Sequence, residues 1–201
     1  MNPRAAFFDA IADKWDGWED LVALRRRMAA GLSHMGLGAR ETVLDIGCGT
    51  GNLTMALLAA LEAAGRVVAV DISARMVAVA SGKVRDPRVT WHVASAEALP
   101  LSDASIDRIM CFSVWPHLQS AAAVLGEFTR LLRPEGYLHI WHLTPREKIN
   151  QIHLSAGDPV SGDILLPASG TAARLRAAGY EVIETIDDAE QYLVTARRKA
   201  K

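Results

Sequence analysis

The chain alternates short apolar, β-branched runs with longer segments rich in alanine and leucine. The apolar runs predict strands in five places, near 42–46, 66–71, 89–93, 106–111 and 136–142. The segment after the first run, 52–64, is rich in alanine and leucine and predicts a helix. Because strand and helix signals alternate, the pattern predicts an α/β fold with a parallel sheet covered by helices on both faces.

Two further apolar runs follow near the end of the chain, at 180–186 and 191–196. The residues between them are too few for a helix, so the two runs predict a hairpin with one strand antiparallel to the rest. The first 35 residues predict one or two helices, and 143–169 predicts a short helix followed by a loop. We expect one domain over residues 1–201, with 1–35 as a helical cover and 143–169 as a lid or substrate wall.

Composition and charge narrow the class of protein. Half of the 201 residues are hydrophobic, 22% are charged, and the net charge is −1. Basic residues cluster only at 25–27 and 197–201, which disfavours a nucleic-acid partner. No stretch approaches a membrane span and the N-terminus does not resemble a signal peptide, so we expect a cytoplasmic protein with no membrane partner. Cys48 and Cys111 lie far apart and are expected to be reduced packing residues.

Three glycines follow the first predicted strand, in the stretch TVLDIGCGTGNLT. Glycine is needed where φ is positive or where a ligand touches the main chain, and the free N–H groups of the next helix favour a polar ligand. The GxGxG spacing of Gly47, Gly49 and Gly51 fits neither the dinucleotide fingerprint GxGxxG nor the P-loop. A nicotinamide-dependent oxidoreductase is therefore disfavoured. The carboxylate of Asp45 suits a ligand with an ammonium and a sulfonium better than a pyrophosphate.

The segment 43–51 resembles the first motif, (V/L)LDxGxGxG, of the class I methyltransferases that use S-adenosylmethionine. Further matches follow in the expected order over roughly residues 40–142: RVVAVDIS, VASAEALPLSDASIDRIMCFSVWPHL and LLRPEGYLHI. The resemblance implies a Rossmann-like, seven-stranded sheet with strand order 3-2-1-4-5-7-6 and one antiparallel strand. The chain is similar to a small-molecule branch of the family, that of the ubiquinone and menaquinone methyltransferases.

The resemblance implies S-adenosyl-L-methionine as cofactor, at the carboxyl ends of the strands where the strand order reverses. Its methionine part is expected against the main chain of the three glycines, with Asp45 toward the ammonium and Asp71 accepting from both ribose hydroxyls. A core role is the alternative for Ile72 and Met76, and a helix cap or a solvated charge is the alternative for Asp71 and Glu97. The remaining expected contacts of the cofactor are Cys48 through its main chain, Ile72, Met76, Ser95 where relatives often have aspartate, Ala96, Glu97 and Phe112.

Histidines are the candidate catalytic residues. His117 follows the fourth predicted strand, His142 ends the fifth, and His153 lies in the segment 143–169. We expect these three to line the acceptor pocket as bases or substrate contacts. Two alternatives stay open: a zinc, nickel or copper site completed by Asp163 or water, and packing, because the sequence separation lacks a compact ligand spacing.

The other three histidines are expected to be structural, and two tryptophans are candidates for either the pocket or packing. His34, His92 and His139 fall in a predicted helix or inside predicted strands and are expected in the core or on the surface. Trp115, and Trp15 with Asp16, are candidate walls of the pocket, with packing as the alternative.

The leading hypothesis is an S-adenosylmethionine-dependent methyltransferase that transfers a methyl group to a small-molecule acceptor by in-line displacement. The alternative is a catalytically silent module that binds the cofactor, or a partner subunit. The sequence specifies no acceptor atom, and we expect a monomer or homodimer.

Overall fold

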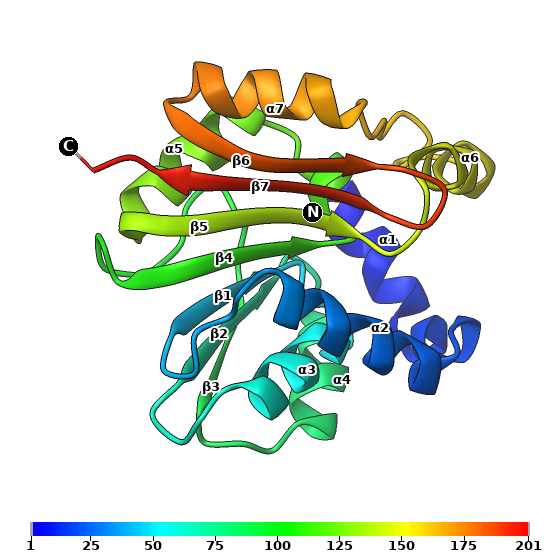
Figure 1. Ribbon diagram of the computed structural model, residues 1–201. Coiled ribbons are helices and arrows are strands. Elements are labelled where there is room, and N and C mark those ends of the chain that lie inside the picture. The colour runs from blue at the N-terminus through cyan, green and yellow to red at the C-terminus, as the bar shows by residue number, and fades with distance from the viewer. Residues whose placement is uncertain (1, 201) are drawn as a thin grey trace. The chain divides into compact units, whose positions relative to one another are not determined.

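The computed structural model describes residues 2–200 (Figure 1). Its strands follow the order β3-β2-β1-β4-β5-β7-β6, which confirms the predicted fold class. The elements along the chain are α1 (Pro3–Ile11), the 3-10 helix η1 (Ala12–Trp18), α2 (Leu21–His34), β1 (Thr42–Ile46), α3 (Asn52–Ala60), β2 (Arg66–Asp71), α4 (Ala74–Lys83), β3 (Val89–Val93), β4 (Ile106–Phe112), the 3-10 helix η2 (Trp115–His117), α5 (Ala121–Leu131), β5 (Leu132–His142), α6 (Arg146–Ala156), α7 (Ala168–Ala177), β6 (Tyr180–Asp187) and β7 (Tyr192–Arg198).

The chain divides into two compact units, with the boundary between Ser95 and Ala96. In the first unit β1 pairs with β2, and β2 with β3, all in parallel. Helix α3 packs against β1 and β2, α4 packs against β2 and β3, and α1 packs against α4 (Figure 1). The side chains of Val43, Leu44 and Val67 are fully buried between these layers because the strands are apolar on both faces.

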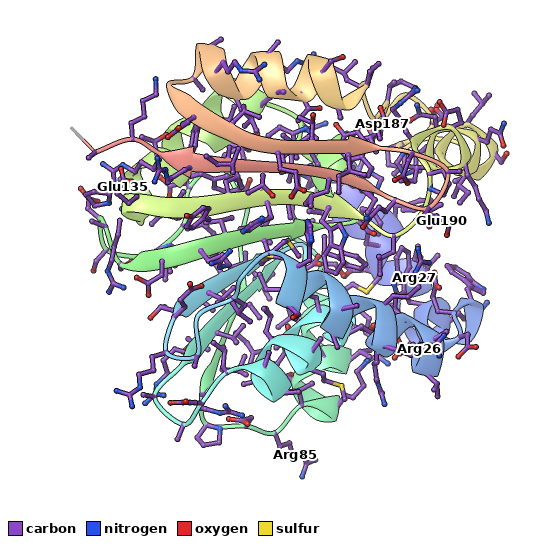
Figure 2. The ribbon with its side chains drawn as sticks, in the orientation of Figure 1. Arg26, Arg27, Arg85, Glu135, Asp187 and Glu190 are labelled. Carbon is purple, nitrogen blue, oxygen red and sulfur yellow. The ribbon has the colours of Figure 1, made fainter. Side chains whose placement is uncertain are left out.

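The second unit contains the other four strands. β4 pairs in parallel with β5, whereas β7 is antiparallel to both β5 and β6, so the predicted hairpin is confirmed. Helix α7 lies along β6 and β7 (Figure 1). Asp187, at the end of β6, lies near the start of α7 (Figure 2). Its carboxylate accepts from Arg146 Nε and from the main-chain N of Ala168, both at 3.0 Å, and so joins β6 to α6 and α7.

Two element boundaries differ by four residues from those predicted, and those of β4, β6 and β7 by one or two. Helix α3 ends at Ala60, because Leu61 turns to an extended conformation and buries its side chain at 6% exposure. Strand β5 begins at Leu132, four positions before the predicted start at 136, because Leu132 still pairs with Ile106 before the register shifts. The residues in between include Glu135 with φ of 66°, so the Pro-Glu-Gly sequence forms an irregularity within the strand.

A row of polar side chains crosses β4, β5 and β7 inside the second unit. Arg108, 2% exposed, lies with Nη1 2.6 Å from His139 Nε2 and with its guanidinium 4.9 Å from the centre of the Tyr137 ring. Burial, followed by the charge of Arg108, holds the pKa of His139 well below its usual value. The neutral imidazole therefore accepts from Arg108 and donates from Nδ1 to Thr195 Oγ1 at 3.0 Å.

None of the helices within residues 2–200 has the length and apolar character needed to cross a membrane.

Candidate functional site

The turn between β1 and α3 has the backbone conformation that only glycine adopts readily. The φ angles of Gly47, Gly49 and Gly51 are 65°, 50° and 83°, all in the left-handed region. The main-chain N of Cys48 donates to the carbonyl of Val70 at 3.0 Å, which ties the turn to β2. The predicted strand-to-helix turn with positive φ angles is confirmed.

Gly49 and Gly51 are needed for different physical reasons. A Cβ atom at Gly51 would lie 3.1 Å from the Cβ of Ala80, so this glycine allows α3 and α4 to approach closely. A Cβ atom at Gly49 would meet no heavy atom within 4 Å among the described residues beyond its two chain neighbours. The main chain at Gly49 therefore faces open space, as a surface that contacts a ligand directly must do.

Asp71, the last residue of β2, braces this turn. Its side chain is 8% exposed, and Oδ2 accepts from the main-chain N of Gly49 at 2.9 Å while Oδ1 accepts from that of Ser73, also at 2.9 Å. Burial raises the pKa of Asp71, and these N–H donors oppose the rise. The main-chain N–H of Ile72 is a third donor, and a carboxylate has about four acceptor positions, so Asp71 is still able to accept from a ligand hydroxyl.

Asp45 is a buried carboxylate with one unpaired oxygen. Its side chain is 1% exposed; Oδ2 accepts from Thr54 Oγ1 at 2.6 Å, and Oδ1 has no hydrogen-bond partner. Burial, with a smaller contribution from the charge of Asp71, raises the pKa of Asp45 to about 7. An orphaned acidic oxygen next to the glycine turn fits a positively charged ligand group, such as the ammonium of S-adenosylmethionine.

The other predicted cofactor residues are distributed over both units. Cys48 and Met76 bury their side chains, at 5% and 2% exposure, and burial raises the pKa of the Cys48 thiol well above its usual value. The predicted contact of Cys48 through its main chain does not require an exposed side chain. The remaining positions are Ile72, half-buried; Ser95, exposed at the end of the first unit; Ala96, buried; Glu97, exposed; and Phe112, half-buried with its ring centre 4.9 Å from that of Trp141.

Three histidines from separate elements meet in the second unit: His117 from η2, His142 from the end of β5 and His153 from α6. The ring centres of His117 and His153 are 4.6 Å apart. Asp163 joins them, since its Oδ2 lies 2.7 Å from His117 Nδ1 and its main-chain oxygen lies 2.6 Å from His153 Nδ1. Because an acceptor faces each Nδ1, we assign the ring proton to Nδ1 in both residues, with the lone pair on Nε2.

His142 completes this group. Burial, and then the proximity of His117 and His153, lowers its pKa to about 3, and burial also lowers the pKa of His153. Both rings are therefore neutral at pH 7. Among the buried side-chain atoms of the described residues, only His142 Nε2 and Asp45 Oδ1 lack a hydrogen-bond partner. Each lies at the carboxyl end of a strand that was predicted to face a ligand.

The arrangement of the histidines bears on the metal alternative. Within residues 2–200, no group of three or more His, Cys, Asp or Glu side chains is placed to hold a metal ion. The hydrogen bonds to Asp163 instead leave imidazole nitrogens ready to accept a proton. A free Nε2 lone pair suits a general base, a hydrogen-bond acceptor or a metal ligand alike, so the roles of the three histidines stay predictions.

Two carboxylates have partners that the sequence analysis did not identify. Asp163, considered only as a metal ligand, orients His117 and His153. Asp16, considered as a pocket wall beside Trp15, accepts from Thr50 Oγ1 at 2.6 Å within the glycine turn. Neither contact gives a periodic signal in the sequence, because Asp16 and Thr50 are 34 residues apart and His117 and Asp163 are 46 residues apart. Trp115 is buried at 6% exposure.

Comparison with known proteins gives a consistent result. Residues 44–140 match a family described as a methyltransferase domain. The demethylmenaquinone methyltransferase of Lactiplantibacillus plantarum is 32% identical over 134 residues, which cover 63% of this chain and 56% of that protein. The ubiquinone/menaquinone biosynthesis C-methyltransferase UbiE of Hahella chejuensis is 33% identical over 141 residues, covering 67% of this chain and 57% of that protein. The chain thus spans a little over half the length of these relatives.

A crystal structure of a SAM-dependent methyltransferase from Aquifex aeolicus has the same fold, with a TM-score of 0.71 at 23% identity over 85% of this chain and 88% of that one. A glycine turn after β1 and an acid at the end of β2, in a sheet of this strand order, define a Rossmann-like domain of the methyltransferase type. The comparisons and the fold support a class I S-adenosylmethionine-dependent methyltransferase, and the chain is similar to the ubiquinone and menaquinone methyltransferases over a little over half of their length.

Proposed function

We propose that the protein transfers a methyl group from S-adenosyl-L-methionine to a small-molecule acceptor. The observation that carries the proposal is the turn at Gly49, where the main chain is held by Asp71 and faces open space. The relatives named above are themselves described as methyltransferases, which favours transfer over a module that only binds the cofactor. The cytoplasm as its compartment, and a monomer or homodimer as its assembly, stay predictions from the sequence.

The cofactor would be held by residues at the carboxyl ends of β1 and β2 in the first unit. The main chain of Gly47, Gly49 and Gly51 would contact its methionine part, Asp45 its ammonium and Asp71 its ribose hydroxyls. When bound, S-adenosylmethionine supplies a methyl group on a sulfonium, which is already an electrophile. The protein therefore has to hold and orient the reactants, exclude water and, for a protonated acceptor, remove a proton. The proposed contacts of the adenine are Ile72, Met76, Ser95, Ala96 and Glu97, and Phe112 is a further proposed contact of the cofactor.

The histidine group is proposed as the acceptor side of the site. Nε2 of His117 would take a proton from an O–H or N–H group of the acceptor, leaving the lone pair on the acceptor as the nucleophile. Asp163 supports this role, because its carboxylate accepts from Nδ1 and stabilises the imidazolium that forms. Nε2 of the neutral, buried His142 would accept a further hydrogen bond from the acceptor.

Cofactor binding is tested by isothermal titration with S-adenosylhomocysteine, with NAD as the comparison ligand. We expect the protein to bind S-adenosylhomocysteine and not NAD, and Asp71→Ala to weaken binding by about 1 to 3 kcal/mol, because two charge-assisted hydrogen bonds to the ribose disappear. Asp86→Ala is the matched control, since Asp86 likewise accepts from the main-chain N two residues on, at Arg88. Equal affinity in folded Asp71→Ala and Asp86→Ala variants contradicts the assignment of Asp71.

The acceptor is sought by incubating the protein with methyl-labelled S-adenosylmethionine and fractionated metabolites. With an acceptor in hand, we expect His117→Ala to lower kcat by roughly 100-fold or more, as loss of a general base does, with unchanged affinity for S-adenosylhomocysteine. His142→Ala and His153→Ala should lower turnover less, and His34→Ala, at the end of α2, should have no effect. Normal turnover of the first three variants, without a metal detected by mass spectrometry, removes these histidines from the acceptor site.

A further inference from the structure

The N-terminal segment, α1 and η1, has little buried apolar surface. Helix α1 has no buried residue, and Ala12 is the only buried residue of η1. Phe7, Phe8 and Trp15 are half-buried and pack on one another, with ring centres 5.3 Å apart for the phenylalanines and 6.3 Å for Phe8 and Trp15. Since apolar burial normally supplies most of the docking free energy, polar contacts carry an unusual share of it here.

Three aspartates provide those contacts. Asp9, Asp13 and Asp16 are spaced four and three residues apart, so they lie along one side of a helical segment. Asp9 Oδ1 accepts from Ser73 Oγ at 2.6 Å and from the main-chain N of Arg75 at 3.0 Å, both at the start of α4. Asp13 pairs with the side chain of Arg75 at 2.7 Å. The first two aspartates thus join the segment to the helix that follows Asp71.

Asp16 joins the segment to the glycine turn. Its Oδ1 accepts from Thr50 Oγ1 at 2.6 Å and from Asn52 Nδ2 at 2.8 Å, and its Oδ2 accepts from Lys83 Nζ at 2.7 Å. Lys83 also donates to Asn52 Oδ1 at 3.1 Å, which closes the group. Thr50 lies between Gly49 and Gly51 and is 2% exposed. The carboxylate of Asp16 therefore holds a side chain inside the turn that would contact the cofactor.

The exposures of these ion pairs show which one matters most. The side chains of Asp13 and Arg75 are 63% and 53% exposed, and such surface pairs contribute little. Those of Asp16 and Lys83 are 28% and 24% exposed, and Asp16 accepts from two neutral donors in addition. Burial alone raises the pKa of Asp16, but hydrogen bonds from Lys83 and its other donors lower it below that of a free carboxyl. The carboxylate is therefore ionised at neutral pH.

We propose that Asp16 is a positioning residue for the cofactor turn: it latches residues 3–18 onto the turn through Thr50, Asn52 and Lys83, so that docking of this segment and cofactor binding strengthen each other. The coupling half of this inference rests on the proposed function. Because such coupling is reciprocal, cofactor binding must strengthen the docking of residues 3–18 by the same factor by which that docking strengthens cofactor binding.

The test compares Asp16→Asn with Asp13→Asn, which removes the same charge from the same short helix. Hydrogen exchange of the amides of residues 3–18, read by mass spectrometry, measures how often the segment opens. We expect Asp16→Asn to accelerate this exchange about tenfold and to weaken S-adenosylhomocysteine about tenfold, and Asp13→Asn to stay within about twofold on both. S-adenosylhomocysteine should slow the exchange in the unmodified protein and much less in Asp16→Asn.

Variants at the other end of the latch separate positioning from general damage. Thr50→Val, which removes the hydroxyl at nearly constant volume, should reproduce Asp16→Asn, and Thr50→Ser should restore normal affinity. The double variant Asp16→Asn/Thr50→Val should bind no more weakly than either single variant, because the two residues act as a unit. Circular dichroism is used to confirm that each variant is folded.

Each result decides between the inference and its rivals. Exchange in Asp16→Asn equal to that in Asp13→Asn overturns the latch. Faster exchange in Asp16→Asn with unchanged affinity for S-adenosylhomocysteine makes Asp16 a structural contact only and overturns the positioning role. If the unmodified protein binds no S-adenosylhomocysteine, the proposed function fails and the coupling fails with it, while the exchange of the ligand-free variants still decides whether the latch exists.

Discussion

Replacing Gly49 by valine is expected to lower the affinity for S-adenosylhomocysteine by about 100-fold or more while the protein still folds. The φ of 50° at this position is strained for a branched residue, which costs about 1 to 3 kcal/mol of stability. Apart from Gly49 and its two chain neighbours, no heavy atom of residues 2–200 lies within 4 Å of the added Cβ, so the side chain projects into the open space proposed for the cofactor. Titration calorimetry and thermal unfolding measure the two effects separately.

Gly36→Val is the matched control for this substitution. Gly36 has φ of 63° and would also place its Cβ in open space, but it lies just after α2 and away from the turn. It should lose similar stability and keep normal affinity. Gly49→Ala provides a milder variant if the valine prevents folding. Normal binding by a folded Gly49→Ala or Gly49→Val variant means that the main chain of the turn does not contact the cofactor.

Replacing Asp45 by asparagine is expected to stabilise the ligand-free protein at pH 8 while weakening cofactor binding about tenfold or more. A pKa of about 7, against 3.8 for a free carboxyl, corresponds to a penalty of about 4 kcal/mol for keeping Asp45 ionised. The amide is neutral but still partly unsatisfied, so we expect a net gain of about 2 kcal/mol. The ammonium of the cofactor meanwhile loses its carboxylate partner.

The stability gained by Asp45→Asn should increase with pH. Because the pKa of Asp45 is raised in the folded state, protonation below about pH 7 relieves the penalty, which is absent below the unfolded value of 3.8. The advantage of Asp45→Asn should therefore be full above pH 7 and vanish as the pH falls toward 4. Urea unfolding at pH 8 and pH 5 measures it.

Asp86→Asn is the control for the loss of an acid from the same unit. Hydrogen bonds from Arg88 lower the pKa of Asp86 to about 2, so its removal should not stabilise the protein at pH 8. An Asp45→Asn variant that is less stable than the unmodified protein at pH 8, or one that binds S-adenosylhomocysteine normally, contradicts the role assigned to Asp45.

Local sequence pattern was enough to predict most of the sheet. The bounds of β1, β2 and β3 match those predicted, because each is a short run rich in β-branched or aromatic residues and bounded by residues that end strands. The start of β5 was not predictable in this way: Pro-Glu-Gly is typical of a turn, whereas pairing with β4 continues through it. The deciding interaction is between strands and leaves no local signal.

In the candidate site, too, local sequence pattern predicted some positions but not the contacts between distant segments. Strand order and alternation predicted that Asp45 and His142 lie at strand ends, and both carry an unpaired buried atom. The partners of Asp16 and Asp163 depend on how distant segments meet, as when His117 and Asp163 come within 2.7 Å across 46 residues of chain. A single carboxylate in a loop gives no pattern from which that meeting could be inferred.

The buried row of Arg108, His139 and Thr195 has a consequence for how the second unit selects its native strand alignment. Arg108 stacks on its register partner Tyr137, and His139 bonds to its register partner Thr195. Sliding any of the three strands by one residue moves these side chains to the opposite face and leaves a guanidinium buried without its acceptor. Misaligned pairings are therefore far less stable than the native one, so the buried row favours the native register of β4, β5 and β7 during folding.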